Sequence, residues 1–220
     1  DGYIWFATNS GLCQYDGYSI RTIKSNLYTP DVLNNNIIYC LQEDDNHHVW
    51  LGTYNGLNVL DKRTGKIEKI VCENFPDRVI SKILITSGGS ILLGTESSVF
   101  QYLPEKNEFR RYFPQDSVRG SVKALIEDSQ HNIWIGTWSD GLYRYDPVRD
   151  RLLHYPSLEP ENVIHSIFED SKPRNWVGTW KNGIYLLENS YEIDNMIIRS
   201  FTCPLYKLDA VDERDSVVSV

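Results

Sequence analysis

Three acidic pairs are the first residues whose type and spacing could do chemistry. They are Glu43-Asp44, Glu127-Asp128 and Glu169-Asp170. Neighbouring carboxylates can serve as general acid and base when their environments separate their pKa values. A catalytic pair is needed once, however, and these pairs return at intervals of 84 and 42 residues. A turn aspartate that accepts backbone N–H bonds is needed in every copy of a repeated unit. We therefore expect these pairs to be structural.

The histidines offer no evident catalytic centre. They are His47, His48, His131, His154 and His165. Three of them fall in predicted turns, and His165, on a predicted inner strand, has no identifiable partner. A lyase or glycosidase would need a non-repeating cluster of histidine, tyrosine and carboxylate side chains. We expect this chain to hold no catalytic residue, metal or cofactor, and we keep such an enzyme as an alternative.

Aromatic and polar residues that could bind a sugar follow three Gly-Thr pairs. The aromatic residues are Tyr54, Trp138 and Trp180, and the polar residues close behind them are Asn55, Asp140 and Asn182. Aromatic faces stack on sugar C–H surfaces, while amides and carboxylates bond to hydroxyl groups. These six residues are our candidate ligand-binding set. The alternative is that the rings pack on a neighbouring loop.

Two arginines extend this candidate set. Arg78 and Arg119 each lie just before a predicted strand, on the side of the molecule where we expect the aromatic residues. They could pair with an anionic sugar, or they could simply be solvated.

All of these residues have fixed places in a repeat. Its mark is a Trp, then Gly-Thr, then Gly with Leu or Ile. The threonine recurs as Thr8, Thr53, Thr95, Thr137 and Thr179, with separations of 45, 42, 42 and 42 residues. The third copy has lost its Trp. Helical repeats of this length would show apolar residues at i, i+3 and i+4, which these units do not.

The residue pattern of each repeat predicts four short strands. In the fourth copy, apolar or alternating segments at residues 122–126, 133–137, 142–145 and 151–155 are separated by polar turns. Four strands in about 42 residues are typical of one propeller blade. The sequence therefore predicts an all-β fold, a β-propeller of four-stranded antiparallel blades, with about five blades in this chain. The predicted segments are 1–24, 37–71, 80–113, 122–155 and 163–201, with the first strand of a further or closing blade at 216–220.

The recurring tryptophans have a structural role in this prediction. A four-stranded sheet cannot bury both faces alone, so neighbouring blades must stack and a large side chain must fill the space between them. We expect that role for Trp5, Trp50, Trp134 and Trp176.

The two ends of the chain suggest a way to close the ring of blades. The chain begins inside a repeat, as part of a longer protein would, with a second strand at residues 3–7, and it ends with a first strand at 217–220. Pairing these two strands would complete a blade and hide both edges. A closed five-blade ring and a part of a larger ring are both open at this point.

Composition narrows the range of partners. The net charge is −8 and the pI is about 5.1, which argues against nucleic acid and against an anionic membrane surface. No apolar run approaches the ~20 residues needed to span a bilayer. The four cysteines form no Cys-x-x-Cys pair, and we expect them to be buried thiols rather than disulfides or metal ligands. They are Cys13, Cys40, Cys72 and Cys203.

The best single unit resembles a known repeat. It runs from Leu33-Asn34-Asn35-Asn36-Ile37 through Glu43-Asp44 to Val49-Trp50-Leu51-Gly52-Thr53-Tyr54-Asn55-Gly56-Leu57. This unit is similar to the two-component regulator propeller repeat, and the resemblance covers nearly the whole chain. WD repeats would show Gly-His and Trp-Asp, and kelch repeats would show Gly-Gly in each copy, which this chain does not.

The resemblance implies a sensor. Such repeats form the periplasmic region of hybrid two-component histidine kinases anchored in the inner membrane of polysaccharide-degrading bacteria. The implied ligand is an oligosaccharide, the implied assembly is a homodimer, and binding would set kinase activity and the transcription of glycan-utilisation genes. The alternative from another class is a protein-interaction or dimerisation propeller without a ligand site.

Overall fold

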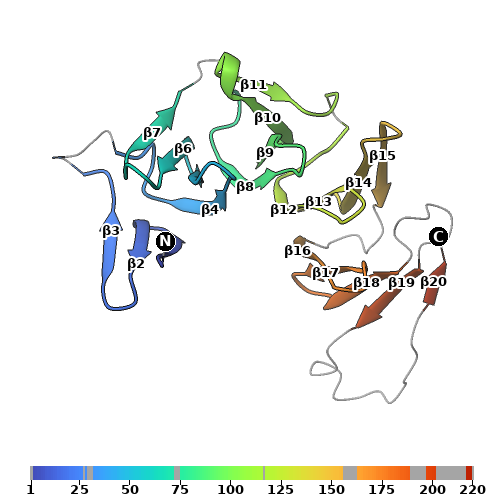
Figure 1. The fold of residues 1–220 in the computed structure, drawn as a ribbon. Helices are drawn as coiled ribbons and strands as arrows, with labels where there is room; N and C mark the ends of the chain where they lie inside the picture. The colour runs from blue at the N-terminus through green and yellow to red at the C-terminus, as the bar shows by residue number, and fades with distance from the viewer. Residues whose placement is uncertain are drawn as a thin grey trace. The chain divides into compact units, whose positions relative to one another are not determined.

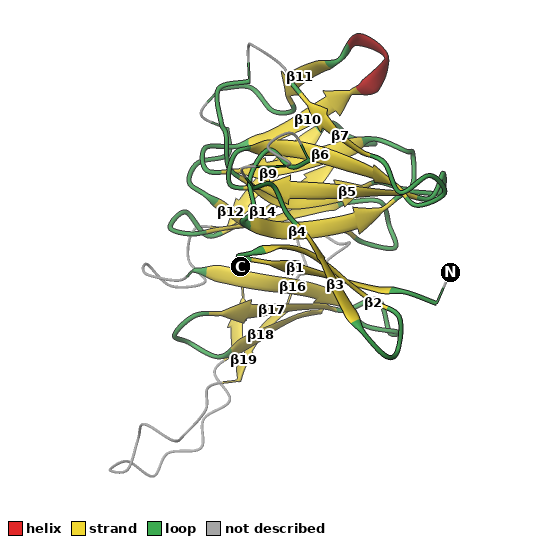
Figure 2. Ribbon diagram, turned by 90° about the vertical axis from the view of Figure 1, so that its left-hand side faces the viewer, coloured by secondary structure: helices red, strands yellow, loops and turns green. Residues whose placement is uncertain are grey.

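The computed structural model describes residues 2–26, 28, 32–71, 75–115, 117–155, 163–188, 197–201 and 217–219. Within these residues the chain is all-β, with one short 3-10 helix, η1 (Pro104–Lys106). Figure 2 shows the strands in yellow and this one helical turn in red. No helix among the described residues is long and apolar enough to cross a membrane.

The strands form five antiparallel sheets, each made of strands that follow one another along the chain (Figure 1). The first sheet contains β1 (Ile4–Thr8), β2 (Gly11–Tyr15) and β3 (Ile20–Ile23). The second contains β4 (Ile38–Glu43), β5 (His48–Thr53), β6 (Gly56–Asp61) and β7 (Ile67–Ile70). The third contains β8 (Ile80–Ile85), β9 (Ile91–Thr95), β10 (Val99–Leu103) and β11 (Glu108–Arg111).

The last two sheets continue the pattern. The fourth contains β12 (Val122–Glu127), β13 (Ile133–Thr137), β14 (Leu142–Asp146) and β15 (Arg151–Tyr155). The fifth contains β16 (Ile164–Glu169), β17 (Asn175–Thr179), β18 (Ile184–Glu188), β19 (Ile197–Phe201) and β20 (Val217–Ser219). The predicted β-propeller of four-stranded antiparallel blades is therefore confirmed, and the strands begin within a residue or two of the predicted positions.

The pairing of the last strand differs from the closed-ring alternative, which was one of the two left open. β20 is an additional strand on the outer edge of the fifth sheet, where Val217, Val218 and Ser219 pair with Arg199, Ile198 and Ile197 of β19. The expected pairing with residues 3–7 is not among the ladders of the described strands, in which β1 pairs with β2. The edge of β19 offers the same unpaired N–H and C=O groups as the edge of β1, so edge pairing alone could not decide between them. A place in a larger ring stays a prediction.

The chain divides into two compact units, residues 1–122 and 123–220, which we describe separately. In the first unit β4 contacts both β1 and β8, so the first three sheets pack in chain order. In the second unit β13 contacts β16, so the fourth sheet packs on the fifth.

The tryptophans of the second and fourth sheets fill these contacts, as predicted. Trp50 packs in a cluster with Ile80 and Phe100 of the third sheet. Trp134 is 0% exposed and packs in a cluster with Ile164 and Ile167 of the fifth sheet. Trp5 and Trp176 are partly buried.

In the second and fourth sheets, the glycine of the Gly-Thr pair lies close to the first strand of the next sheet. A Cβ added at Gly52 would lie 2.9 Å from Ile80 Cγ2, and one added at Gly94 would lie 2.6 Å from Val122 Cγ1. At Gly136 an added Cβ would overlap Ile164 Cγ2. Ile80 of β8 thus packs directly on Gly52, and Ile164 of β16 packs directly on Gly136, so a side chain at either glycine would force a shift.

The contact between Gly136 and Ile164 leads to a prediction about stability. We expect Gly136→Ala to lower the free energy of unfolding by about 1–3 kcal/mol, the cost of overpacking a well-filled contact. The matched control is Gly88→Ala, because Gly88 lies in an exposed turn where an added Cβ would meet only Thr86 Oγ1, at an ordinary contact distance of 3.9 Å. Urea denaturation of both variants makes the comparison, and equal effects would show that Gly136 does not mark a sheet-to-sheet contact.

Candidate functional site

A threonine hydroxyl closes the turn that carries each candidate aromatic residue. Thr53 Oγ1 donates to the carbonyl of Gly56 at 2.8 Å, and its equivalents donate to Gly141 at 2.9 Å and to Gly183 at 3.0 Å. The same hydroxyl oxygens accept the backbone N–H groups of the polar residues, Asn55, Asp140 and Asn182. The recurring threonine therefore fixes these turns in one conformation.

The aromatic rings in these turns are half exposed. Tyr54, Trp138 and Trp180 are 51%, 50% and 64% exposed. The backbone N–H of Tyr54 donates to the carbonyl of Ile37, and that of Trp180 donates to the carbonyl of Val163. At Tyr54 and Trp180 the main chain is thus anchored next to the inner strand, while much of all three rings remains open to solvent.

In the second unit, the rings of Trp138 and Trp180 each have a Lys or His neighbour from an inner strand. Lys123 Nζ of β12 lies 5.3 Å from the centre of the Trp138 ring, within the range of a cation–π contact. His165 of β16 stacks on Trp180 with ring centres 5.8 Å apart. The sequence identified no partner for His165, because the two residues meet only once β16 and β17 pair.

Asp140 belongs to a hydrogen-bonded cluster beside Trp138. Its carboxylate accepts the hydroxyl proton of Tyr143, and its main-chain carbonyl accepts a bond of 2.6 Å from His154 Nε2–H. The His154 and Tyr143 rings stack 4.2 Å apart. Sequence reasoning missed this cluster, which depends on the pairing of Tyr143 with His154 across β14 and β15.

Packing of the fourth sheet on the fifth brings two of the aromatic turns to the same end of adjacent sheets. Gly136 of β13 lies against Ile164 of β16. Trp138 follows Gly136 by two residues, and His165, which stacks on Trp180, follows Ile164 directly. The second unit therefore carries two exposed indoles, one carboxylate and one amide in neighbouring turns.

The first unit offers a different arrangement at the corresponding turn. Asn55 and Arg78 line a cavity of about 330 Å³ whose apolar wall includes Leu57, Phe75 and Phe109. Arg78 is exposed, and the described residues give its guanidinium no hydrogen-bonding or carboxylate partner. Arg119 is also exposed but is not part of this lining. The structure thus brings Asn55 and Arg78 together and leaves Arg119 apart from that cavity.

The acidic pairs lie at the other end of the strands and have the predicted structural role. Asp44 and Asp128 each accept two backbone N–H bonds from their own turn. Their second carboxylate oxygen accepts the indole N–H of Trp50 at 2.9 Å or of Trp134 at 2.7 Å. Asp170 and Trp176 repeat this arrangement. Sequence reasoning missed this bond to the indole. A signal for it was present, because the third copy lacks both partners and has Thr86 and Leu92 at the two positions.

These bonds lower the pKa of Asp44 and of Asp170. The side-chain bond from Arg174, with that from Trp176, holds the pKa of Asp170 well below its usual range. Burial alone would raise the pKa of Asp44, but the bonds from Trp50 and His48 outweigh it and lower the pKa.

A pH dependence follows from these shifts. Because the folded-state pKa of Asp170 lies below its ordinary value of 3.8, its contribution to stability is complete above that pH and is lost as the pH falls through the folded-state pKa. We expect Asp170→Asn to flatten the acid limb of the stability curve. The control is Glu105→Gln in the exposed turn η1. Urea midpoints measured from pH 5 to pH 2 test this, and parallel curves for wild type and Asp170→Asn would refute it.

Two of the four cysteines lie among the described residues, and both are free thiols. They are Cys13 and Cys40, and burial raises the pKa of Cys40 to about 12. Cys72 and Cys203 fall outside the described residues. The described part of the chain contains no group of three His, Cys, Asp or Glu side chains that could hold a metal ion.

Comparison with known proteins identifies the repeat. The family model of the two-component regulator propeller matches residues 32–55 and 117–139. A histidine kinase, P4, of Formosa agariphila is 30% identical over 161 residues, which are 66% of this chain and 11% of that protein. The chain therefore spans about a tenth of this relative.

Solved structures share the fold at low sequence identity. The extracellular domain of a protein described as a hybrid two-component system from B. thetaiotaomicron has a TM-score of 0.73 and 22% identity, over 92% of this chain and 31% of that one. A virginiamycin B lyase from Staphylococcus aureus, in an inactive form with quinupristin, has a TM-score of 0.72 and 15% identity, over 94% and 68% of the two chains. Likeness at these identities concerns the fold alone.

Proposed function

We propose that this chain, a run of two-component regulator propeller repeats, is part of the periplasmic ligand-sensing region of a hybrid two-component histidine kinase and recognises an oligosaccharide. The family match and the kinase relative support the first half of the proposal. The whole protein would then be anchored in the inner membrane, act as a homodimer, and control transcription of glycan-utilisation genes.

One observation carries the oligosaccharide assignment. Trp138 and Trp180 present half-exposed indole rings from anchored turns of adjacent sheets, with the Asp140 carboxylate and the Asn182 amide beside them. A rigid aromatic surface with nearby hydrogen-bonding groups suits a sugar ring, which has an apolar C–H face and an equatorial belt of hydroxyl groups. Lys123 adds positive charge next to the Trp138 ring and would favour a sugar that carries an anionic group.

A calorimetric screen of oligosaccharides tests the proposal, using this chain and the complete ectodomain in parallel. We expect one class of oligosaccharide to bind the ectodomain and this chain to retain measurable affinity for it. If the ectodomain binds an oligosaccharide and this chain does not, the site lies in another part of the protein. If no oligosaccharide binds this chain or the complete ectodomain, the proposal that the ligand is an oligosaccharide is wrong.

A second candidate is a lyase, which the likeness to the virginiamycin B lyase and the Asp140–Tyr143–His154 cluster bring forward. The geometry disfavours it, because Tyr143 is buried and its hydroxyl proton, like the His154 Nε2 proton, is already donated within the cluster. A turnover assay on the same glycan panel would decide, and product formation lost in His154→Ala would favour the enzyme.

A further inference from the structure

A second cavity lies between the second and third sheets, at the end of the strands that carries the acidic pairs. It encloses about 550 Å³, a volume typical of small-molecule pockets. Trp50, Val59 and Ile85 contribute to its apolar wall, and Asp44 and Asp45 contribute to its polar edge. It belongs entirely to the first unit and lies at the opposite end of β5 from Tyr54, so it is separate from the proposed oligosaccharide site.

The fourth and fifth sheets each place a cation at the equivalent corner. In the fourth sheet the guanidinium carbon of Arg144 lies 5.6 Å from the centre of the Trp134 ring. In the fifth sheet that of Arg174 lies 5.6 Å from the centre of the Trp176 ring, and Arg174 bonds to Asp170 at 2.6 and 2.9 Å. Two different positions of the repeat thus deliver the same group, a planar cation over the indole.

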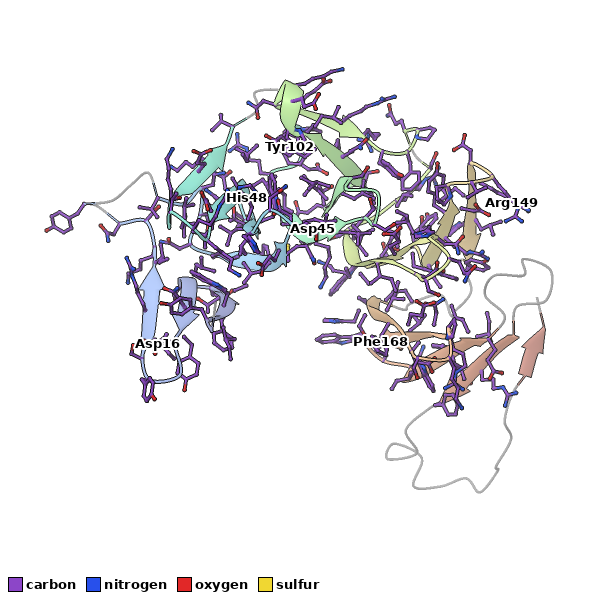
Figure 3. The ribbon with its side chains drawn as sticks, viewed as in Figure 1. Asp16, Asp45, His48, Tyr102, Arg149 and Phe168 are labelled. Atoms are coloured by element: carbon purple, nitrogen blue, oxygen red, sulfur yellow. The ribbon has the colours of Figure 1, made fainter. Side chains whose placement is uncertain are left out.

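The second sheet supplies no such cation. Val59 pairs with Trp50 across β5 and β6, where Arg144 pairs with Trp134 across β13 and β14. His48 stands at the repeat position of Arg174 and bonds to Asp44 at 3.1 Å. Besides the apolar side chains of its cluster, the Trp50 ring meets the ring of Tyr102 edge on, with 5.7 Å between the ring centres. Figure 3 labels His48 and Asp45 in this sheet and Tyr102 in the next.

The charges at this cavity favour a cation from outside the chain. Four carboxylates contribute to its lining, Asp44, Asp45, Asp61 and Glu68. Lys66 neutralises Glu68 at 2.6 Å, whereas Asp45 has no hydrogen bond or ion pair among the described residues. Arg63 stands 3.6 Å from Asp61 and offsets part of that charge. The cavity therefore keeps an excess of negative charge beside an apolar wall.

We propose that this cavity binds a small organic cation, one that carries a guanidinium or amidinium group on an apolar body. The planar cation would take the place over Trp50 that Arg144 takes over Trp134, and the apolar body would lie against Val59 and Ile85. The site goes beyond the proposed function, since it uses none of the residues assigned to the oligosaccharide.

Benzamidine and benzamide test the charge requirement, because they share a shape and differ in the cation. Calorimetry on the wild-type chain should show benzamidine binding with at least tenfold greater affinity than benzamide. Equal affinity, or no benzamidine binding at millimolar concentration, overturns the proposal. The peptide Gly-Arg-Gly distinguishes the source of the cation: tighter binding of the peptide than of benzamidine would place the guanidinium on a protein partner and overturn the small-molecule assignment.

Three variants locate the site. Asp45→Asn should weaken benzamidine binding about tenfold, the value of one hydrogen bond to a charged group. Glu96→Gln removes the same charge at the far end of β9 and should leave affinity unchanged. Val59→Arg copies Arg144 and should abolish binding while keeping the melting temperature at or above that of wild type. Equal affinities for Asp45→Asn and Glu96→Gln contradict the placement, even if Val59→Arg fails to fold.

Discussion

Replacing Trp134 with alanine is expected to lower the free energy of unfolding by about 3–5 kcal/mol. The indole is fully buried between the fourth and fifth sheets, its N–H is bonded to Asp128, and its face supports the guanidinium of Arg144. Truncation would open a cavity, leave an oxygen of a buried carboxylate with one fewer donor, and remove the partner of a buried cation. Trp134→Phe should lower the free energy of unfolding by less than Trp134→Ala does, because a large ring still fills most of the space. Loss of the indole N–H donor to Asp128 should contribute about 1–2 kcal/mol of that decrease.

The matched control for this prediction lies in the same sheet. Trp138→Ala removes the same side chain from a position that is 50% exposed, and it should change the free energy of unfolding by no more than about 0.5 kcal/mol. Urea denaturation followed by circular dichroism measures both variants. Similar losses at the two positions would contradict the division of the tryptophans into packing residues and surface residues.

The second large effect concerns binding rather than stability. The measurement uses the complete ectodomain and the oligosaccharide identified by the calorimetric screen. Trp138→Ala and Trp180→Ala should each weaken the affinity for that oligosaccharide at least tenfold, and the double variant should abolish measurable binding. Stacking on an exposed aromatic ring depends on the ring face itself, and few interface residues other than such anchors carry large binding energies. The melting temperature should stay close to that of wild type.

Phe168→Ala is the control for this pair. Phe168 is 65% exposed on β16, so it is an open aromatic side chain of the same unit that lies outside the turns (Figure 3). The Phe168→Ala variant should bind the oligosaccharide with the affinity of the wild type. A large fall in the melting temperature of the Trp138 or Trp180 variant would mark that residue as a packing residue, and equal binding losses in all three variants would remove the special role of the turns.

The order of the strands could be predicted because the repeat is regular. Thr53, Thr95, Thr137 and Thr179 recur every 42 residues, and each now has an identified function, the closing of a hairpin turn. The structural role of Asp44 and Asp128 was also predictable from recurrence. Their bonds to Trp50 and Trp134 could have been found from the third copy, which lacks both partners at once.

Features that depend on two sheets or two strands meeting could not be read from one repeat. The need for glycine at position 136 arises from Ile164, which is 28 residues away and belongs to the next sheet. The contact between His165 and Trp180 and the cluster of Asp140, Tyr143 and His154 depend on strand register in the same way. The partner of β20 could not be chosen from the sequence, because exposed strand edges resemble one another in sequence.

The central claim is that the exposed indoles of the second unit form the oligosaccharide-binding surface. Oxidative footprinting of the complete ectodomain, with and without its bound oligosaccharide, tests this claim at the level of single residues. The account predicts that Trp138 and Trp180 become protected while Phe168 remains as reactive as before. Unchanged oxidation of both tryptophans at saturating oligosaccharide would contradict it.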